Sequence, residues 1–190
     1  MAGLTDIIKR TTGFILAGGN SRRFGSDKRM HRIGSATLID RTINILTQLL
    51  GCHPFVVGDN LDGFHFENKY LLNDAEKNRG PLGGLVSVLE NCPTEFALVL
   101  AVDLPNINVE DLEYLLINAD ESFDVSSLSH NDMPEPLIAL YNTESAGFWR
   151  EKLETGSLSI SANLNQLRIK LISPPGGIKS LLNINNLEDL

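Results

Sequence analysis

The sequence predicts a doubly wound α/β fold built on a mostly parallel sheet, with an irregular C-terminal half. The first observation is a set of short apolar runs with the length of buried strands, at residues 14–17, 54–57, 70–72 and 96–102. The second is a set of segments with helical spacing of apolar residues, at 38–50, 84–91 and 109–118. Strands that alternate with helices in this way are typical of a parallel sheet covered by helices on both faces.

The second half of the chain alternates less regularly. We expect two strands joined by a polar loop over residues 129–135, and then two helices separated by Gly156. The expected elements are strands at 124–128 and 137–141, helices at 145–153 and 159–164, and an edge strand at 168–172. A Pro-Pro-Gly-Gly turn at 174–177 then leads to an extended piece at 181–185 and a short terminal helix.

The composition is that of one ordinary soluble globular domain. The chain has 190 residues, of which 42% are hydrophobic and 21% are charged, and this length is sufficient for a full core. No apolar segment approaches the length of a membrane span, and residues 1–12 lack the apolar region of a secretory signal. Cys52 and Cys92 lie far apart and outside any C-x-x-C pair, so we expect reduced thiols in a cytoplasmic protein.

The most informative stretch follows the first apolar run. Phe14–Ala17 leads directly into Gly18 and Gly19, where the missing side chains allow a sharp turn and a close approach to a ligand. Arg23 and Lys28 follow shortly afterwards. A buried strand that opens into glycines and cations is typical of a polyphosphate-binding loop, in which main-chain N–H groups and cationic side chains hold the oxygens. The alternative is a solvated, arginine-rich surface loop, but such loops seldom follow a fully apolar strand through two glycines.

The distribution of charge supports a local anionic ligand. The chain has 16 basic and 24 acidic residues and a net charge of −8. Residues 20–32 contain five of the basic residues and a single acid, and setting these six aside leaves 11 basic and 23 acidic residues, a net charge of −12. A basic loop on an acidic protein favours a small anionic ligand and argues against a nucleic-acid-binding surface.

Two common nucleotide-binding templates are absent from this loop. Gly18, Gly19 and Gly25 have the wrong spacing for G-x-G-x-x-G. Ser26 and Asp27 follow Gly25 where a P-loop has Lys and then Ser or Thr. A dinucleotide-dependent oxidoreductase and a P-loop NTPase are therefore disfavoured.

Two acids are candidates for a metal site. Asp103 directly follows the apolar run 96–102, and an acid at the end of a buried strand is costly unless a cation satisfies it. Mg²⁺ suits this position, because it takes one or two carboxylates and completes its shell with water and phosphate oxygens. The alternative for Asp103 is a cap of the helix that begins near Val109, which lies several residues away. Asp74 is the candidate second carboxylate, and its alternative is a solvated loop acid.

A glycine-rich turn begins one of the expected helices. Residues 79–84 are Arg-Gly-Pro-Leu-Gly-Gly. Glycines at the start of a helix let its N–H groups approach an anionic ligand closely. A tight loop that needs glycine only for its turn explains the same residues, and this segment alone does not decide between the two interpretations.

The first loop resembles the L-A-G-G-x-S-x-R-M-G-x-D-K motif of MobA-type nucleotidyltransferases. The matching positions are Leu16, Ala17, Gly18, Gly19, Ser21, Arg23, Gly25, Asp27 and Lys28, while Phe24 stands in place of the usual Met. Later motifs of the family are matched in the same order by Gly80-Pro81-Leu82-x-Gly84, Asp103-x-Pro105, Pro136–Tyr141, Gly156–Leu158 and Asn183–Leu190. The terminal Asn-Ile-Asn separates this family from related cytidylyl- and sugar-nucleotidyltransferases, which share the opening loop.

The resemblance spans about residues 13–190 and implies a Rossmann-like nucleotidyltransferase fold. It implies a single domain over residues 1–190, with a nucleotide half at about 13–118 and an acceptor half at about 119–190. The implied reaction is transfer of GMP from GTP to the terminal phosphate of molybdopterin or Mo-molybdopterin, with release of pyrophosphate and formation of the guanine dinucleotide cofactor. Mg²⁺ is the implied cofactor. Nucleic-acid and membrane partners are not expected, and transient contact with other cofactor-biosynthesis proteins is left open.

The resemblance also assigns roles to residues. Arg23, Lys28 and Asp103 are the expected catalytic residues. The expected nucleotide-binding residues are Leu16, Ala17, Gly18, Gly19, Lys28, Asp74, Gly80, Pro81, Leu82, Gly84 and Asp103. Asp103 is expected to hold the metal, with Asp74 as the candidate second ligand. Asn183 and Asn185 are expected on the pterin side.

One departure from the family bears on the base. The family often has Asn where Gly58 follows the second apolar run, at a position implicated in holding guanine, and Asp59 and Asn60 are the nearby candidates to replace it. The alternative enzyme is a related nucleotidyltransferase that uses CTP or a sugar-1-phosphate acceptor. The alternative of a different class is a non-catalytic nucleotide-binding protein, and the retention of Lys28 and Asp103 argues against it.

Overall fold

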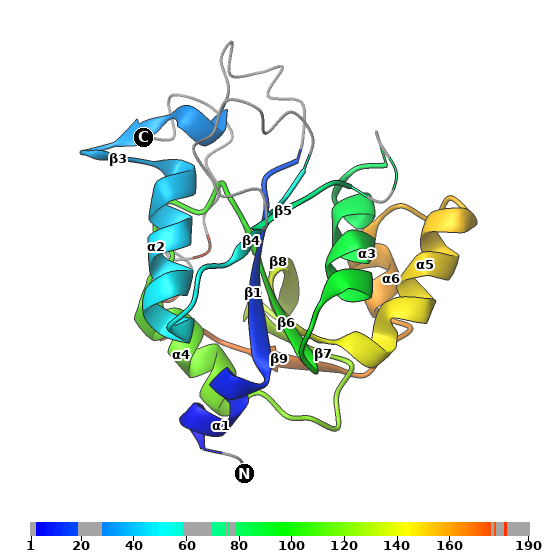
Figure 1. Cartoon of the computed structure of the whole chain (residues 1–190). Coiled ribbons are helices and arrows are strands. Elements are labelled where there is room, and N and C mark those ends of the chain that lie inside the picture. The colour runs from blue at the N-terminus through cyan, green and yellow to red at the C-terminus, as the bar shows by residue number, and fades with distance from the viewer. Residues whose placement is uncertain are drawn as a thin grey trace.

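The chain folds around one sheet with helices on both faces, in a computed structural model that describes residues 3–18, 28–58, 70–74, 76, 79–175, 177 and 181 (Figure 1). The strands are β1 (Thr11–Leu16), β2 (Arg32–Ile33), β3 (Ala36–Thr37), β4 (Phe55–Val57), β5 (Leu71–Leu72), β6 (Phe96–Ala101), β7 (Val125–His130), β8 (Met133–Asn142) and β9 (Ile169–Ile172). The helices are α1 (Leu4–Lys9), α2 (Leu38–Leu50), α3 (Pro81–Asn91), α4 (Val109–Asn118), α5 (Ala146–Glu154) and α6 (Ile160–Leu164), with 3₁₀ turns η1 (Lys28–Met30) and η3 (Thr143–Ser145). The main sheet has the strand order β5-β4-β1-β6-β8-β7-β9, and β2 pairs with β3 in a separate hairpin.

The first half of the sheet is wholly parallel. β1 pairs with β4 on one side and with β6 on the other, and β4 pairs with β5. Leu16 lies opposite both Val57 and Ala101, and Val57 in turn lies opposite Leu72. The four strands therefore end together at one edge of the sheet, which we name the carboxyl edge. Ligands of doubly wound sheets bind outside this edge.

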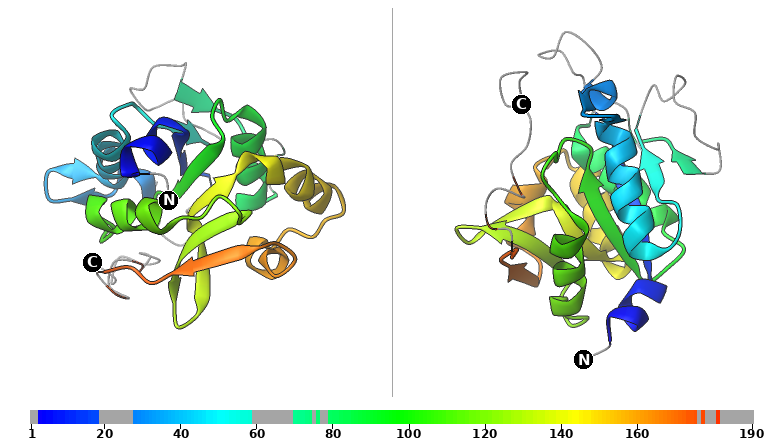
Figure 2. Two further views of the ribbon diagram at one scale, coloured as in Figure 1. Left: turned by 90° about the horizontal axis from the view of Figure 1, so that it is seen from below. Right: turned by 90° about the vertical axis from the view of Figure 1, so that its left-hand side faces the viewer.

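The second half of the sheet contains the one antiparallel strand that the main sheet has within the described residues. β8 runs antiparallel to β6 and β7, while β9 runs parallel to β7 at the margin of the sheet. Asn131 and Asp132 join β7 to β8 with φ angles of 48° and 60°, as a type I′ turn requires. The hairpin tip projects from the body of the molecule (Figure 2, right). The predicted loop over residues 129–135 is therefore wrong, because His130 already pairs with Met133.

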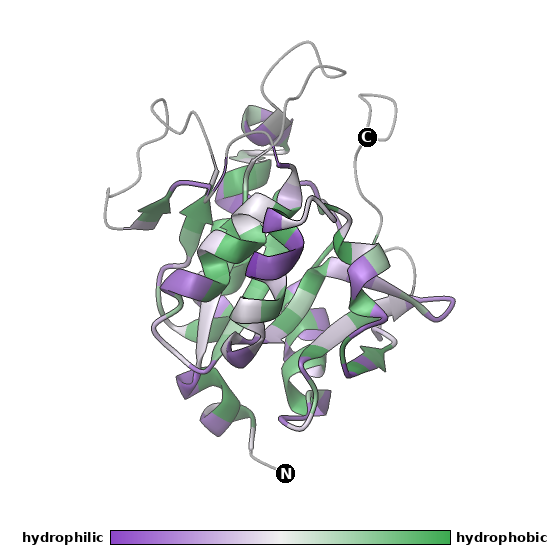
Figure 3. Ribbon diagram, turned by 90° about the vertical axis from the view of Figure 1, so that its right-hand side faces the viewer, coloured by the Kyte–Doolittle hydropathy of each residue, from purple (hydrophilic) through white to green (hydrophobic). Residues whose placement is uncertain are grey.

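Helices cover the two faces of the sheet in separate layers. α1, α2 and α4 lie on one face, and α3, α5 and α6 lie on the other (Figures 1 and 2). Buried apolar side chains form two corresponding clusters, one containing Ile15 and Leu46 and the other containing Phe14 and Trp149. Seen from the side of α3 and α5, hydrophilic residues gather on the outward faces of the helices (Figure 3). None of the helices in the described part of the chain combines the length and the hydrophobicity that crossing a membrane requires.

Local sequence signals set the boundaries of the helices. Thr37 caps α2, where its hydroxyl oxygen accepts the amide hydrogen of Asp40 at 3.2 Å. Gly51 ends α2 with a left-handed φ angle of 70°. Asn108 caps α4, where its side-chain oxygen accepts the amide hydrogen of Asp111 at 2.8 Å.

Most predicted elements lie close to their predicted positions. The helices predicted at 38–50 and 109–118 have those bounds in the structure. α3 begins at Pro81, earlier than predicted, because the fixed φ angle of proline suits the first helical position. The sequence pattern does not predict α1 or the β2–β3 hairpin, which are too short to have a periodic pattern of their own. The extended piece at 181–185 and the terminal helix lie, apart from Leu181, outside the described residues.

The edge of the sheet opposite the carboxyl edge, which we name the amino edge, is closed by a cluster of ion pairs. Arg10, between α1 and β1, donates to the carboxylate of Glu95 at 3.0 and 2.6 Å and to that of Glu121 at 2.5 and 3.1 Å. The Arg10 guanidinium also lies 5.1 Å from the centre of the Phe96 ring. The bond from Arg10 holds the pKa of Glu95 below its usual range.

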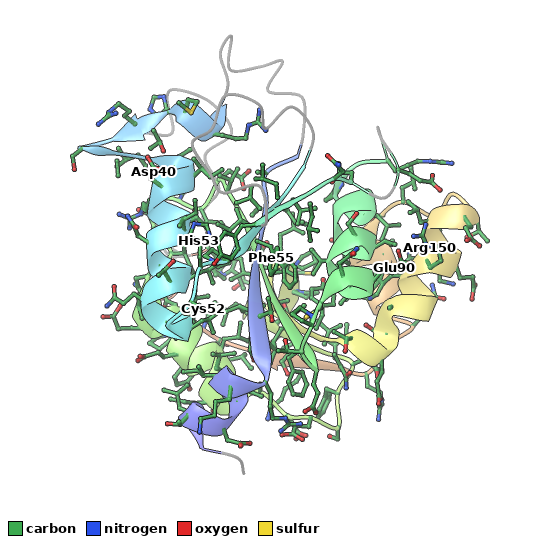
Figure 4. The ribbon with its side chains drawn as sticks, in the orientation of Figure 1. Asp40, Cys52, His53, Phe55, Glu90 and Arg150 are labelled. Carbon is green, nitrogen blue, oxygen red and sulfur yellow. The ribbon has the colours of Figure 1, made fainter. Side chains whose placement is uncertain are left out.

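Side-chain contacts also join the outer helices to each other and to the sheet. Arg150 of α5 donates to both carboxylate oxygens of Glu90 in α3, at 2.8 and 2.5 Å (Figure 4). Trp149 packs edge-on against Tyr141, with 6.0 Å between the ring centres. The Tyr141 hydroxyl donates to the carbonyl oxygen of Pro136 at 2.7 Å, which satisfies this buried polar group.

Candidate functional site

The glycines and acids singled out in the sequence follow the strands at the carboxyl edge. β1 is followed by Ala17 and Gly18, β4 by Gly58, β5 by Asn73 and Asp74, and β6 by Val102 and Asp103. Main-chain bonds continue the sheet past the strand ends, because the Ala17 N–H donates to the carbonyl oxygen of Val57 at 2.8 Å. The Gly58 N–H likewise donates to the carbonyl oxygen of Leu72 at 3.1 Å. Residues from four strands are thereby held next to one another.

Asp74 lies over the end of β1, although β4 separates β1 from its own strand β5. A methyl group on Gly18 would lie 3.3 Å from Oδ2 of Asp74. A methyl group on Gly84, in the first turn of α3, would lie 3.2 Å from Oδ1 of Asp74. The half-buried carboxylate therefore fills the space between the end of β1 and the start of α3.

Gly58 presses against the same strand end. It has a φ angle of 155°, and a β-carbon there would lie 2.8 Å from the main-chain nitrogen of Gly18 and 3.0 Å from the carbonyl carbon of Ala17. Contacts that short with main-chain atoms exclude a side chain unless the backbone moves. In this chain the backbone therefore requires glycine at the position where the family often has Asn. Asp59 and Asn60, the candidates to replace that Asn, lie outside the described residues.

The turn at the start of α3 combines exposed and buried residues. Gly80 has a left-handed φ angle of 65° and open space around it, so its glycine serves the turn. Gly80 and Pro81 are exposed. Leu82 is 0% exposed and packs in the core between α3 and the sheet. Because the whole residue is buried, Leu82 supports this turn from the core side and presents no exposed atom to a ligand.

Asp103 adjoins β1 from the other side. The N–H of Val102 donates to the carbonyl oxygen of Leu16 at 3.3 Å, which fixes the residue before Asp103 beside the end of β1. The Asp103 residue itself is half-buried. Asn108 provides the cap of α4, so the interpretation of Asp103 as that cap is excluded. Asp74 and Asp103 thus both adjoin the strand end that opens into the glycine loop.

The basic segment of the chain returns to this edge. η1 begins at Lys28, and the next residue, Arg29, donates from Nη1 to the carbonyl oxygen of Ala17 at 3.3 Å. The main chain of Lys28 therefore lies at the same edge of the sheet as Asp103. The sequence pattern shows Arg29 only as one cation among several, and its bond to the strand end becomes visible only in the structure. Gly19 and Arg23 lie outside the described residues.

The second half of the sheet brings Glu135 to the carboxyl edge. Ile138 of β8 lies opposite Leu100 of β6, so Glu135 lies beyond that pair, level with the residues that follow β6. Burial raises the pKa of the Glu135 carboxyl group. No sequence motif marks this residue, because its position depends on the extended hairpin. Asn183 and Asn185 lie outside the described residues.

The donor atoms at this edge suit a hard divalent cation. Within the residues that the structure describes, no group of three or more His, Cys, Asp or Glu side chains could hold a metal by itself. Asp74 and Asp103 offer carboxylate oxygens, which Zn²⁺ seldom uses without nitrogen or sulfur ligands. Mg²⁺ takes one or two carboxylates and obtains its other ligands from water and phosphate oxygens. The residues therefore fit a metal that is shared with a bound phosphate.

Comparison with known proteins identifies the family. A family model described as the MobA-like NTP transferase domain matches residues 13–166, from within β1 to just after α6. The chain belongs to the MobA-like NTP transferase family. A relative from Desulfosudis oleivorans, named molybdenum cofactor guanylyltransferase, is 30% identical to this MobA-like chain over 186 residues, which cover 94% of this chain and 92% of the relative. The family membership expected from the sequence motifs is thus confirmed.

Solved structures confirm the predicted nucleotidyltransferase fold of this MobA-like chain. Molybdopterin-guanine dinucleotide biosynthesis protein A from Archaeoglobus fulgidus superposes with a TM-score of 0.78 at 22% identity, covering 94% of each chain. CMP:2-keto-3-deoxy-manno-octonic acid synthetase, solved in complex with CTP, superposes with a TM-score of 0.67 at 16% identity, covering 90% of this chain and 94% of the other. At these identities the similarity concerns the Rossmann-like fold, which by itself does not select a base.

Proposed function

We propose that this protein transfers GMP from GTP to the terminal phosphate of molybdopterin or Mo-molybdopterin, releasing pyrophosphate and forming the guanine dinucleotide cofactor. The proposal depends on one observation above all: the Asp74 carboxylate, the residue before Asp103 and the guanidinium of Arg29, which follows Lys28, all adjoin the end of β1. The names of the relatives from Desulfosudis oleivorans and Archaeoglobus fulgidus support the choice of GTP and of a pterin acceptor.

The proposed nucleotide site begins at the end of β1. The main chain of Leu16–Gly19 contacts the nucleotide, since a strand that opens into glycines lets N–H groups approach phosphate oxygens. Arg23 and Lys28 neutralise the triphosphate. Gly80 and Pro81 border the nucleotide from the start of α3, and Leu82 and Gly84 support that turn from the core side.

The proposed cofactor is Mg²⁺, the divalent cation that the donor set fits best. Asp103 holds the metal, with Asp74 as the candidate second ligand. When bound, Mg²⁺ neutralises charge on the phosphate oxygens and on the leaving pyrophosphate. The two carboxylates would hold the metal beside the end of β1.

The proposed reaction needs no covalent intermediate with the protein. The phosphate monoester of the acceptor is already a nucleophile, so the residues of the chain need only align the two phosphates and stabilise charge. Lys28 and Arg23 do so for the donor, while Asn183 and Asn185 hold the pterin side of the acceptor. We place this reaction in the cytoplasm, without a nucleic-acid or membrane partner.

A cytidylyl- or sugar-nucleotidyltransferase is the second candidate function. Gly58 favours it, because the required glycine removes the side chain that the family often uses at the guanine-binding position. The fold is shared with an enzyme solved in complex with CTP. The two candidate functions therefore differ in the base that the site selects.

Pyrophosphate release tests both candidates. The purified protein is incubated with Mg²⁺ and each of the four NTPs, with and without molybdopterin, and pyrophosphate is measured. We expect release with GTP only, and only when molybdopterin is present. Release with CTP and not with GTP would overturn the guanylyl assignment, and no release with any NTP would overturn nucleotidyl transfer to molybdopterin.

A further inference from the structure

The two glycines that border the start of α3 differ in what they require. Gly80 has a left-handed φ angle of 65°, but nothing lies within 4 Å of the position of a β-carbon. Gly84 lies within α3 and has no positive φ angle, so its backbone conformation suits any residue. A glycine inside a helix destabilises it by roughly 0.5–1 kcal/mol relative to alanine. Conformation therefore explains Gly80 but not Gly84.

The lack of room for a side chain explains why residue 84 is glycine. A methyl group there would lie 3.2 Å from Oδ1 of Asp74, 3.1 Å from Cδ2 of Leu16 and 3.8 Å from Cγ1 of Val57. Leu16 is 7% exposed and Val57 is 0% exposed, so both are held by the core around them. The Asp74 carboxylate is half-buried and lies in a connection between a strand and a helix, so we expect a methyl at position 84 to displace it rather than the two core side chains.

We propose that Gly84 is a positioning residue, which sets the place of the Asp74 carboxylate at the carboxyl edge by leaving it room against the first turn of α3. This inference rests on the proposed function in that it takes Asp74 as a group that acts on the metal-bound triphosphate. Gly84 borders the Asp74 carboxylate on the side of α3 and acts only by leaving room for it. Displacing a group that orients a metal ligand typically costs about 10- to 100-fold in metal affinity.

A neighbouring glycine provides a matched control. A methyl group on Gly83 would lie 2.8 Å from the carbonyl oxygen of Glu76 and 3.6 Å from Cβ of Arg79. Gly83→Ala therefore strains the same turn of α3 against the preceding connection, and Asp74 is not among its contacts. Its effect on the protein should be independent of the Asp74 side chain.

A double-mutant cycle tests the proposal. The affinity for GTP is measured by calorimetry over a series of Mg²⁺ concentrations for the wild type, Gly84→Ala, Asp74→Asn and the double variant. We expect Gly84→Ala to weaken Mg²⁺-dependent binding by about 10-fold or more and to have little further effect in the Asp74→Asn protein. Gly83→Ala should add its full effect in both backgrounds.

Additive effects of Gly84→Ala and Asp74→Asn would overturn the proposal, as would wild-type Mg²⁺ dependence in Gly84→Ala. If Gly84→Ala does not fold, Leu16→Ala is combined with it, since this removes the Leu16 contact and leaves the one with Asp74. The cycle is run with GTP, CTP and ATP. Binding of CTP alone would contradict the guanylyl assignment, and the cycle with CTP would still measure the coupling between Gly84 and Asp74.

A crystal structure of Gly84→Ala without nucleotide gives an independent answer. A displaced Asp74 carboxylate supports the proposal, and an unmoved carboxylate with a shifted Leu16 overturns it.

Discussion

The amino and carboxyl edges of the sheet are built from different contacts. At the amino edge, Arg10 binds the carboxylates of Glu95 and Glu121 and lies over the Phe96 ring, so charges of the chain neutralise one another. At the carboxyl edge the Asp74 carboxylate occupies the space that side chains on Gly18 and Gly84 would need, and Arg29 of the basic segment donates to the carbonyl oxygen of Ala17. One edge joins elements of the fold, while the other combines glycine main chain with acidic and basic side chains, which suits the phosphate ligand and metal that we propose.

We expect this difference to separate stability from function along a single sheet. Changes at the amino edge should lower the thermal stability and leave nucleotide binding intact. Changes at the carboxyl edge should affect binding and turnover with little loss of stability. The measurements below would either contradict this separation of the two edges or show how large it is.

The largest expected effect is on turnover, at the carboxyl edge. Asp103→Ala and Lys28→Ala should each lower the rate of pyrophosphate release by at least ~10²-fold, as expected when one preorganised charged group is lost. The melting temperature of each variant should stay near that of the wild type. Near-normal rates in both variants would remove these residues from the mechanism.

A smaller and more selective effect is expected on the acceptor side. Asn183→Ala should weaken molybdopterin binding by about 10-fold, on the scale of losing one hydrogen bond to a polar ligand, with GTP affinity largely unchanged. Titrating each substrate separately into the variant measures both. Equal losses for the two substrates would contradict a role confined to the pterin side.

At the amino edge, Arg10→Ala should lower the melting temperature by about 2–4 °C for a chain of this size, without altering GTP affinity. The change leaves Glu95 and Glu121 without their shared cation. Lys9→Ala is the control, because it removes the same charge from the exposed neighbouring residue. A loss of GTP affinity in Arg10→Ala but not in Lys9→Ala would show that the two edges are coupled.

Acid should weaken an ion pair that fixes the last strand of the sheet. Arg168 donates to both carboxylate oxygens of Asp124, at 3.2 and 2.6 Å, and these bonds lower the pKa of Asp124. A lowered carboxyl pKa stabilises the fold above the usual value of about 4, and this contribution is lost as the pH falls through the folded-state pKa. Thermal unfolding should show Asp124→Asn less stable than the wild type at neutral pH, with the gap closing as the pH falls through the lowered pKa of Asp124. A gap that stays constant with pH would contradict this explanation.

The smallest expected effect is a gain in stability away from both edges. Gly147 is exposed near the start of α5, and nothing lies within 4 Å of the position that a methyl group on it would occupy. Gly147→Ala should stabilise the fold by about 0.5 kcal/mol, because glycine disfavours the helix, and turnover should not change. Calorimetric unfolding and the pyrophosphate assay check the two parts, and a fall in turnover would mean that α5 contributes to the site.

The sequence predicts the parallel half of the fold well, for physical reasons. Buried parallel strands are continuous apolar runs, so 96–102 marks β6 closely, and helix α2 has both an apolar face and clear caps at Thr37 and Gly51. The strand ends then follow from topology, because parallel strands meet at one edge. The grouping of Asp103 with the glycine loop could therefore be expected before the structure was known.

The remaining features depend on contacts between distant parts of the chain. The turn at Asn131 and Asp132 is polar, and the pattern does not distinguish a tight hairpin from a longer loop. Asp74 crosses above β4 to reach β1, which no local signal indicates. The glycine at position 84 could be recognised as unusual in a helix, but its reason, the carboxylate beside it, required the structure. The roles predicted for Arg23, Lys28, Asp74, Asp103, Asn183 and Asn185 stay predictions.

The most direct test of the proposed site is a crystal structure of the protein with GTP and Mg²⁺. We predict a triphosphate against the end of β1, with the metal between its oxygens and the Asp103 carboxylate and with Lys28 on the same side. A nucleotide bound away from the carboxyl edge, or a triphosphate that Asp103 and Lys28 do not share, would contradict this prediction.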